Sequence, residues 1–317
     1  MMLKFTELPR GRCLGKLLNN HMFKQIIAVL GPTASGKSKI ALDLAKKYHG
    51  FLISADSRQI YKELNIVTGK DVGVWQDGVY RVEGVEEYLV DFLSPLETYS
   101  AAQYQQAVYE LLAQNPDRLP ILVGGTGLYA QAVLDNYQFP PALDEKILAD
   151  LNHRYENEGL APLVAELQAQ NIDLGEGFKN PRRVLRALSY FYQTGENWLN
   201  RDLKGPLMFE KTIRLGMDWP RPTLYQRIDQ RVEEMMSQGA LAETENLYQK
   251  YGENWPAVDS LGYQELIAHL KGEITLTTAI DLMKQRSRNY AKRQLTWFKK
   301  DQQIKWVNPE DDFSLGF

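Results

Sequence analysis

A glycine-rich motif near the N-terminus, Gly31-Pro-Thr-Ala-Ser-Gly-Lys-Ser38, constrains the fold of this chain more than any other stretch. It follows an apolar run, Gln25–Leu30, and opens a helical pattern from Lys37 to Tyr48. Glycines at its first and sixth places let several backbone N–H groups converge on one hollow, which suits the oxygens of a di- or triphosphate. Lys37 adds a positive charge, and Ser38 offers a hydroxyl to a Mg²⁺ ion. We name residues 31–38 the phosphate loop. An ordinary glycine-rich turn is the alternative, and the flanking strand and helix patterns disfavour it.

The composition is that of a globular protein of 317 residues, of which 44% are hydrophobic. A chain of this length has room for two domains, or for one domain with an insertion. The formal net charge of −3 argues against an evenly basic nucleic-acid-binding protein, although basic residues can still gather locally. Cys13 is the only cysteine, which excludes an internal disulfide and fits a reducing compartment. No apolar run has the length of a membrane span. We therefore expect a cytoplasmic monomer with no membrane partner.

Strand and helix patterns alternate along the first part of the chain, which predicts a parallel sheet. Ser100 and Gln103 form a capping box that predicts a helix to about residue 113, and Gly50 is expected to cap the preceding helix. A small hairpin is expected within 74–93. Strands are expected at 25–30, 51–54, 119–123, 212–217 and 303–307. These patterns predict an α/β fold, namely a P-loop nucleotide-hydrolase-like parallel sheet flanked by helices.

The pattern changes at about residue 138, where strand signals stop. Residues 143–193 show three or four helical patterns, and later helices are expected at 221–238, 258–270 and 277–300. The first residues are basic and lack the apolar core of a signal peptide, so a loose tail or a translation start at Met22 is expected. We divide the chain into an N-terminal tail (1–22), the first part of the core (23–137), a helical insertion (138–205) and the core completion with C-terminal helices (206–317).

Asp56 follows the strand at 51–54, and residues just past strand ends line the ligand crevice of such sheets. Its carboxylate is a candidate general base or metal partner, and a turn-forming or helix-capping role is about equally plausible. Thr126 lies in a second glycine turn, Gly124–Tyr129, and offers a hydroxyl to a ligand unless the turn is merely structural. Asp91 resembles the acidic residue that ends a strand in many phosphate-loop enzymes, and a surface carboxylate is the alternative.

The C-terminal helix is rich in cations, with no acidic residue between Leu282 and Lys300. Aromatic residues are interleaved with these cations, a combination that suits a nucleic acid with exposed bases. A solvated basic face with buried aromatics is the alternative for a single helix. The predicted insertion carries a second basic cluster, and two clusters in an acidic chain favour RNA. The two sets are Lys284, Arg286, Arg288, Lys292, Arg293, Lys299 and Lys300, and Lys179, Arg182, Arg183 and Arg186.

Taken together, these motifs resemble the tRNA dimethylallyltransferase family, also called tRNA isopentenyltransferase. They occur in the family's order over nearly the whole chain beyond the tail. The residues that carry the resemblance are the phosphate loop, Ser54–Tyr61, Tyr99-Ser100, Gly124–Tyr129, Asn180–Leu188, Arg227–Arg231, Leu261-Gly-Tyr263 and Ala291–Trp297. The family transfers a dimethylallyl group from its diphosphate to N6 of the adenosine immediately 3′ of the tRNA anticodon, position 37.

The resemblance implies a role for each motif. Asp56 would take the amine proton, and Lys37, Ser38, Mg²⁺ and Arg231 would stabilise the departing diphosphate, with Ser38 as the metal ligand. Thr126 would line the channel for the base. Gly31, Pro32, Thr33, Ala34, Ser35, Gly36, Lys37 and Ser38 would bind the diphosphate of dimethylallyl diphosphate. The tRNA anticodon stem-loop would contact Asp56, Ser57, Arg58, Gln59, Thr126, Arg182, Arg183, Gly262, Tyr263, Lys292, Arg293, Gln294 and Trp297.

One segment departs from the family pattern. The family usually has Gly-Thr-Ala-Lys-Pro where this chain has Val67-Thr-Gly-Lys-Asp71, and a histidine-containing segment is replaced by Gly73–Val90. Three rival functions stay open at this stage: a phosphate-loop small-molecule kinase that uses ATP, an adenylate isopentenyltransferase, and an RNA-binding module without catalysis. The helical insertion and the basic C-terminal helix favour tRNA as the acceptor.

Overall fold

The computed structural model describes residues 22–140, 143–197 and 203–310. Residues 1–21 of the expected tail lie outside this description. The chain separates into two compact units. Unit 1 comprises residues 1–136 and 206–317, and unit 2 comprises residues 137–205. Over the described residues, no helix combines the length and the apolar character that crossing a membrane requires.

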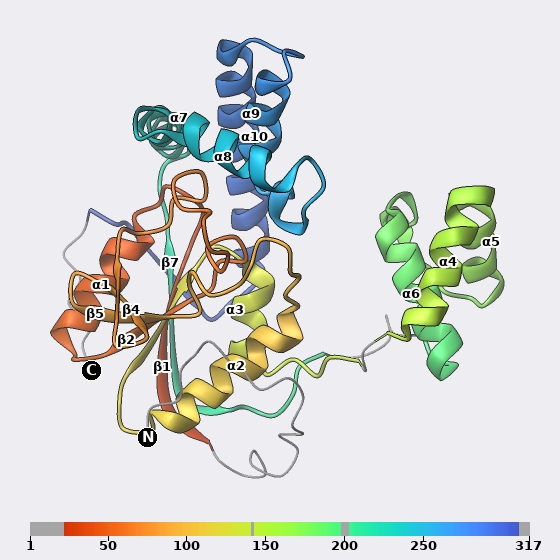
Figure 1. Cartoon of the computed structure of the whole chain (residues 1–317). Helices are drawn as coiled ribbons and strands as arrows, with labels where there is room; N and C mark the ends of the chain where they lie inside the picture. Colours follow the sequence, from red (N-terminus) through yellow and green to blue (C-terminus); the bar gives the residue numbers. More distant parts are fainter. Residues whose placement is uncertain (1–21, 141–142, 198–202, 311–317) are drawn as a thin grey trace. The chain divides into compact units, whose positions relative to one another are not determined.

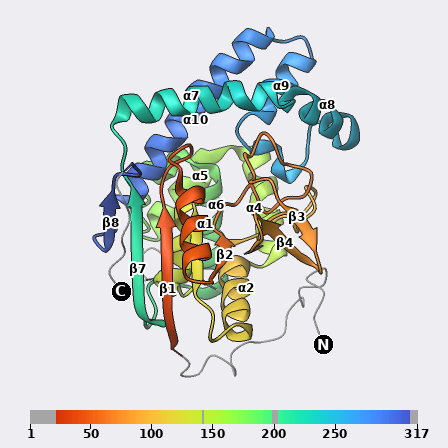
Figure 2. The same cartoon turned by 90° about the vertical axis from the view of Figure 1, so that its left-hand side faces the viewer.

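Unit 1 is built on one mixed sheet of eight strands, in the order β3-β4-β5-β2-β6-β1-β7-β8. Neighbouring strands from β5 to β8 are parallel, and β3 and β4 extend the sheet antiparallel (Figure 2). Leu30, Gly124 and Gly216 are in register where three strands end. The bounds are β1 (Phe23–Leu30), β2 (Phe51–Ser54), β3 (Val74–Gln76), β4 (Val79–Val82), β5 (Val85–Tyr88), β6 (Pro120–Gly124), β7 (Phe209–Met217) and β8 (Ile304–Val307).

Helices cover both faces of this sheet (Figure 1). The apolar face of α1 (Lys37–Lys47) packs through Ala41 and Leu44 on one side of β1 and β6. On the other side, α2 (Ala101–Gln114) and α3 (Gly127–Leu134) bury Tyr104 and Val133 among apolar side chains of the strands. The expected capping box at Ser100 is present, because its hydroxyl accepts from the Gln103 N–H. The result is the predicted layered α/β fold with a parallel core.

The expected hairpin within 74–93 is a meander of three strands. Asp77 and Gly78 join β3 to β4 with positive φ values of 51° and 78°, and Glu83 and Gly84 join β4 to β5 with 48° and 83°. Two consecutive residues in this region form the tight turn that matches strand twist. The last strand, β5, then pairs parallel to β2 and so joins the meander to the core.

Four helices gather beyond the carboxyl ends of the strands (Figure 1). They are α7 (Arg221–Ser237), α8 (Ala240–Tyr251), α9 (Tyr263–Leu270) and α10 (Leu276–Phe298). The prediction of one helix over 258–270 was wrong, because a 3-10 turn (Pro256–Asp259) and Gly262, with φ of 105°, precede α9. The expected cap at Gly50 was also wrong. His49 takes the left-handed conformation, with φ of 51°, whereas Gly50 gives room to the Leu119 carbonyl, which would lie 2.6 Å from a Cβ.

Unit 2 is a helical bundle with its own apolar core. It contains α4 (Glu145–Glu158), α5 (Leu160–Ala169), a 3-10 turn (Gly175–Lys179) and α6 (Pro181–Thr194). Leu151, Leu163, Leu167, Val184 and Leu188 are buried together. Pro181 occupies the first turn of α6, where its missing N–H costs nothing.

Candidate active site

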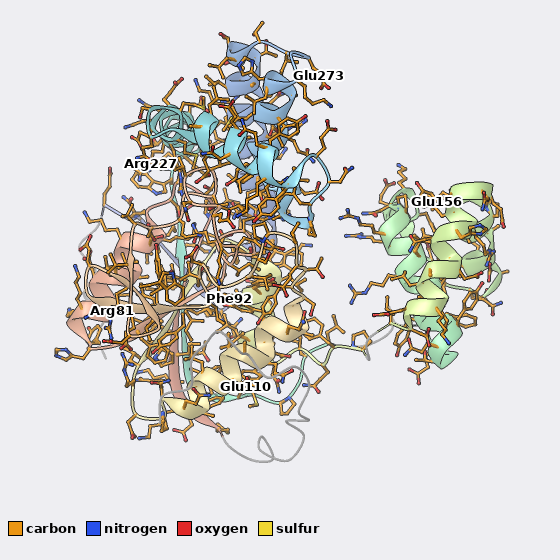
Figure 3. The ribbon with its side chains drawn as sticks, in the orientation of Figure 1. Arg81, Phe92, Glu110, Glu156, Arg227 and Glu273 are labelled. Carbon is orange, nitrogen blue, oxygen red and sulfur yellow. The ribbon has the colours of Figure 1, made fainter. Side chains whose placement is uncertain are left out.

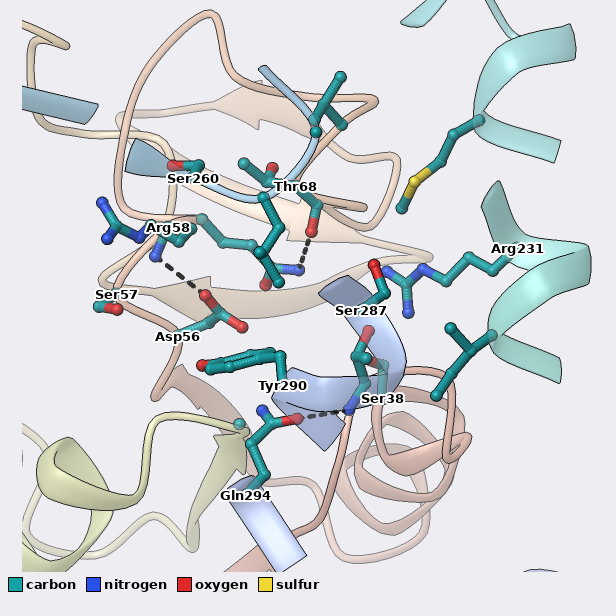
Figure 4. A pocket seen from close by; sticks show the side chains of 18 of the residues that line it. Ser38, Asp56, Ser57, Arg58, Thr68, Arg231, Ser260, Ser287, Tyr290 and Gln294 are labelled. Atoms are coloured by element: carbon teal, nitrogen blue, oxygen red, sulfur yellow. Dashed lines mark hydrogen bonds between the residues drawn. The ribbon is translucent and has the colours of Figure 1, made fainter. Parts of the chain in front are cut away.

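A cavity of about 350 Å³ lies at the carboxyl ends of the strands in unit 1 (Figure 4). The phosphate loop, the segment after β2, α7, the turn before α9 and α10 all contribute to its wall. Predicted residues that line it are Thr33, Lys37, Ser38, Asp56, Ser57, Arg58, Gln59, Arg231, Gly262, Arg293 and Gln294. Residues from distant parts of the sequence therefore share one enclosure, as the position of Asp56 after a parallel strand predicted.

The phosphate loop is held in shape by α7. Arg227, on α7 (Figure 3), donates from Nε to the Ala34 carbonyl at 2.9 Å and packs over the Trp219 ring at 4.5 Å. Trp219 donates from Nε1 to the Ser35 carbonyl at 2.9 Å. The loop includes Ala34 and Gly36 in left-handed conformations, with φ of 61° and 81°. The sequence motif Arg227–Arg231 indicated a role for Arg231 alone and did not predict the contacts of Arg227 and Trp219 with the loop.

The loop residues divide between two hollows. Ala34, Ser35 and Gly36 line a second hollow of about 360 Å³, which shares Lys37, Ser38 and Arg231 with the main cavity. Gly31 and Pro32 line neither, and the Pro32 carbonyl accepts a hydrogen bond from Lys37 Nζ at 3.2 Å. The side chains that face both hollows are thus those best placed to hold an anion between them.

Lys37 and Arg231 are buried cations that face the same space. Burial, and then the charge of Arg231, lower the pKa of Lys37 to about 8, although Asp56 and Asp71 act in the opposite direction. Burial also lowers the pKa of Arg231. Arg231 donates from Nη2 to the Gly69 carbonyl at 3.0 Å. A bound polyanion would relieve the repulsion between the two cations and favour their charged forms.

Asp56 both forms a turn and faces the cavity. Its Oδ1 accepts the backbone N–H of Arg58 at 2.9 Å, which satisfies the turn-forming interpretation (Figure 4). Thr126 stabilises the same segment from behind: its Oγ1 accepts the Ser57 N–H at 3.0 Å and donates to Ser57 Oγ at 3.2 Å. Thr126 itself does not line the cavity. The turn-forming role of Asp56 is therefore confirmed, and its role as general base or metal partner stays a prediction that its position in the cavity wall allows.

The second glycine turn lets α10 approach closely. A Cβ at Gly125 would lie 2.2 Å from Gln294 Nε2, and one at Gly127 would lie 2.2 Å from Trp297 Cδ1. Gln294 is only 5% exposed. Tyr290 lines the cavity beside Asp56 (Figure 4), and burial is the main reason that its pKa is raised to about 12. Tyr290 is one of the aromatic residues interleaved with the cations of the C-terminal helix, and its spacing of four from Gln294 is the sequence signal that places both on one helix face.

The basic cluster on α10 is partly neutralised within the protein. Lys284 pairs with Glu233, Arg288 pairs with Asp229, and Arg286 Nη1 lies 2.6 Å from Glu265 Oε1. The cations closer to the cavity are Lys292 and Arg293, which are exposed. Arg293 packs over the Tyr290 ring at 5.6 Å. The number of cations in the sequence therefore overstates the positive charge that α10 offers to a partner.

Tyr263 and Asp91, two further predicted residues, bind other side chains of the protein and do not line the cavity. Tyr263 is 0% exposed and donates to Glu243 at 2.8 Å, so the fold leaves its side chain no surface for contact with RNA. Asp91 lies 2.5 Å from Lys70 Nζ and accepts from Trp75 Nε1 at 2.8 Å, away from the cavity wall. In unit 2, Arg182 and Arg183 are exposed on α6. Trp297, on α10, is 39% exposed.

Comparisons with known proteins agree over almost the whole chain. The family model described as IPP transferase matches residues 59–301. The tRNA dimethylallyltransferase of Bacillus subtilis is 36% identical in an alignment of 305 residues that covers 93% of this chain and 95% of that protein. The tRNA dimethylallyltransferase of Cytophaga hutchinsonii is 38% identical in an alignment of 296 residues that covers 90% of this chain and 93% of that protein.

Solved structures show the same fold. The tRNA isopentenylpyrophosphate transferase of Bacillus halodurans superposes with a TM-score of 0.64 at 34% identity, covering 90% of this chain and 89% of that one. A eukaryotic dimethylallyltransferase acting on tRNA gives a TM-score of 0.73 at 27% identity, with coverage of 90% and 74%. On the extent of the family match and of these identities, the chain belongs to the IPP transferase family.

Proposed function

We propose that this protein is a tRNA dimethylallyltransferase, which transfers the dimethylallyl group of dimethylallyl diphosphate to N6 of the adenosine 3′-adjacent to the anticodon. The observation that carries the proposal is the shared cavity: Asp56 on one wall, and Lys37, Ser38 and Arg231 on the other. A small-molecule kinase would use both walls as well, because its acceptor hydroxyl also loses a proton. The extended similarity to tRNA dimethylallyltransferases favours prenyl transfer for this cavity.

In the proposed reaction, N6 attacks the allylic carbon as the bond from that carbon to the diphosphate oxygen breaks. The bonding electrons leave with the diphosphate, and the proton of the amine passes to Asp56. Lys37 and Arg231 stabilise the negative charge that develops on the leaving oxygen. Because an allylic carbon tolerates positive charge, the alignment of donor and acceptor contributes much of the rate.

The residues present fit a Mg²⁺ ion bound mainly by the substrate. Ser38 supplies a hydroxyl in the cavity wall, and no group of three or more acidic, histidine or cysteine side chains that could hold a metal is found among the described residues. Mg²⁺ in such sites is often held by one or two protein oxygens, substrate phosphates and water. The ion would neutralise diphosphate charge, with Ser38 as its protein ligand.

The RNA surface proposed here has two parts, each on its own unit. In unit 1, Gly262, Lys292, Arg293 and Trp297 surround the cavity or lie on the adjoining face of α10. In unit 2, α6 presents Arg182 and Arg183. Exposed cations would pair with phosphates, and Trp297 offers a ring for stacking on a base. Ser57, Arg58 and Gln59 would hold the target base beside Asp56.

The direct test is incubation with dimethylallyl diphosphate, Mg²⁺ and an anticodon stem-loop that carries adenosine at position 37, followed by mass analysis of the nucleosides. One prenyl unit should appear on a single adenosine, with release of diphosphate. A matched stem-loop with guanosine at that position is the control and should stay unmodified. Labelled ATP in place of the prenyl donor should leave the RNA unchanged, whereas phosphate transfer would favour the kinase alternative and contradict the proposal.

A further inference from the structure

One stripe of α10 holds both glycine loops of the active site. Tyr290, Gln294 and Trp297 are spaced at helical intervals and face the same side. Tyr290 shares a hydrogen bond with Thr126, and Trp297 packs against Gly127. Gln294, between them, reaches two loops at once.

Gln294 uses both ends of its amide inside the protein. Its Oε1 accepts the Thr33 N–H of the phosphate loop at 3.0 Å, the bond drawn from Gln294 in Figure 4. Its Nε2 donates to the Gly125 carbonyl at 2.9 Å. These bonds use one N–H and one lone pair of the amide, and the side chain is only 5% exposed, so protein covers most of its surface. The glycine at 125 is what leaves space for it, since a Cβ there would overlap Nε2.

The same helix also carries the exposed residues next to the cavity. Lys292 and Arg293 directly precede Gln294 and are exposed, and Arg293 also lines the cavity where RNA is proposed to dock. RNA bound to α10 would restrict the motion of Gln294. Because Gln294 accepts the Thr33 N–H, the position of Thr33 would be restricted as well. The phosphate loop and α10 are thus connected by the hydrogen bond between Thr33 and Gln294, beside the apolar packing of Ala34 with Ala291 and Leu295.

We propose that Gln294 is a positioning residue that ties the phosphate loop to α10, so that RNA docked on α10 and diphosphate held by the loop strengthen each other's binding. This inference rests on the proposed function for the identity of the RNA. It replaces the direct tRNA contact that family resemblance implied for Gln294. Coupling of this kind is reciprocal, because each ligand must change the affinity of the other by the same factor.

The first experiment measures binding of Mg²⁺-pyrophosphate to the full chain by calorimetry, without RNA. Gln294→Met keeps the length of the side chain and removes both hydrogen bonds, so the loop loses a fixed point. We expect the dissociation constant of Mg²⁺-pyrophosphate to rise about tenfold. Asn289→Ala removes an amide from an exposed position of the same helix and is the matched control, with pyrophosphate binding unchanged.

The second experiment repeats the titration with the anticodon stem-loop bound. RNA should tighten pyrophosphate binding in the unmodified chain by about fivefold or more, and this gain should largely disappear in Gln294→Met. A residue that served stability alone would leave the gain intact. If Gln294→Met does not fold, as judged by circular dichroism, Gly125→Ala displaces the same amide and should give the same two results.

Two outcomes would overturn the inference. One is a Gln294→Met protein that binds pyrophosphate normally but has lost affinity for the stem-loop, because Gln294 would then be a direct RNA contact. The other is an unmodified chain whose pyrophosphate affinity does not respond to RNA. Failure of prenyl transfer would instead contradict the proposed function, and would leave both binding measurements interpretable.

Discussion

The wall of the active-site cavity and the basic helix α10 both carry cations, but in different surroundings. Lys37 and Arg231 are enclosed beside the cavity, and burial lowers the pKa of each. On α10, Lys284, Arg286 and Arg288 lie near acidic partners on α7 and α9. Lys37 and Arg231 donate to backbone carbonyls and can still pair with an anionic ligand, whereas a cation that forms an ion pair within the protein is already largely neutralised. Charge counted along a sequence does not distinguish the two.

The largest effect should come from the acidic wall of the cavity. Asp56→Asn keeps the size of the side chain and its acceptor for the Arg58 N–H but removes the base. We expect kcat for prenyl transfer to fall about a thousandfold, within the range of general base catalysis. Single-turnover assays and stem-loop binding would be measured side by side, and RNA affinity should stay near that of the unmodified chain. Unchanged turnover would show that the acidic wall does not act in the reaction.

A second test addresses Glu87, a carboxyl on β5 that lines the cavity and is 5% exposed. Burial foremost, and then Asp71, raise the pKa of Glu87 to about 8, while Lys70 opposes the shift. The folded protein therefore keeps a proton that the unfolded chain releases near its ordinary pKa of 4.5. Its contribution to stability is complete below that pH and is lost as pH rises towards 8.

Glu87→Gln cannot titrate, so its unfolding free energy should depend less on pH between 4.5 and 8. The difference in slope is at most about 1.4 kcal/mol per pH unit. Urea unfolding at several pH values in this window would measure it, and the variant should gain stability relative to the unmodified chain as pH rises. Parallel curves for the two proteins would contradict burial of a protonated Glu87.

A smaller effect is expected on α6, where the cations are exposed. Arg183→Gln should weaken stem-loop binding about fivefold at moderate salt. It should also reduce the slope of log binding constant against log salt concentration by about one. Pyrophosphate binding should be unaffected, because that site is built within unit 1. Filter binding over a range of salt concentrations gives both quantities. If the variant loses the same factor of stem-loop affinity at every salt concentration, Arg183 does not contact a phosphate.

The smallest effect should come from a paired cation on α10. The double variant Arg288→Gln with Asp229→Asn removes an ion pair and leaves the net charge unchanged. Stem-loop affinity should change by less than about twofold, since Asp229 already neutralises Arg288 in this half-buried pair. A loss as large as that of Arg183→Gln would show that Arg288 contacts RNA and would remove the contrast between paired and unpaired cations.

Much of the fold follows from local patterns. The capping box at Ser100, the phosphate loop and the buried run at 51–54 each specify an element from neighbouring residues. The start of α9 could not be predicted in this way, because Gly262 takes a conformation that depends on packing against Val67 and Met283. Asp56 was predicted because the ends of parallel strands meet at one edge of a sheet.

The sequence by itself determined the phosphate loop, the alternation of strands and helices, and the carboxylate after the second strand, since these signals lie within a few residues of one another. Only the tertiary structure decided what holds the loop. Arg227 and Gln294 lie 193 and 261 residues from the backbone groups they bind. No periodicity or spacing links residues so far apart, and their contact exists only once the sheet and its helices have packed.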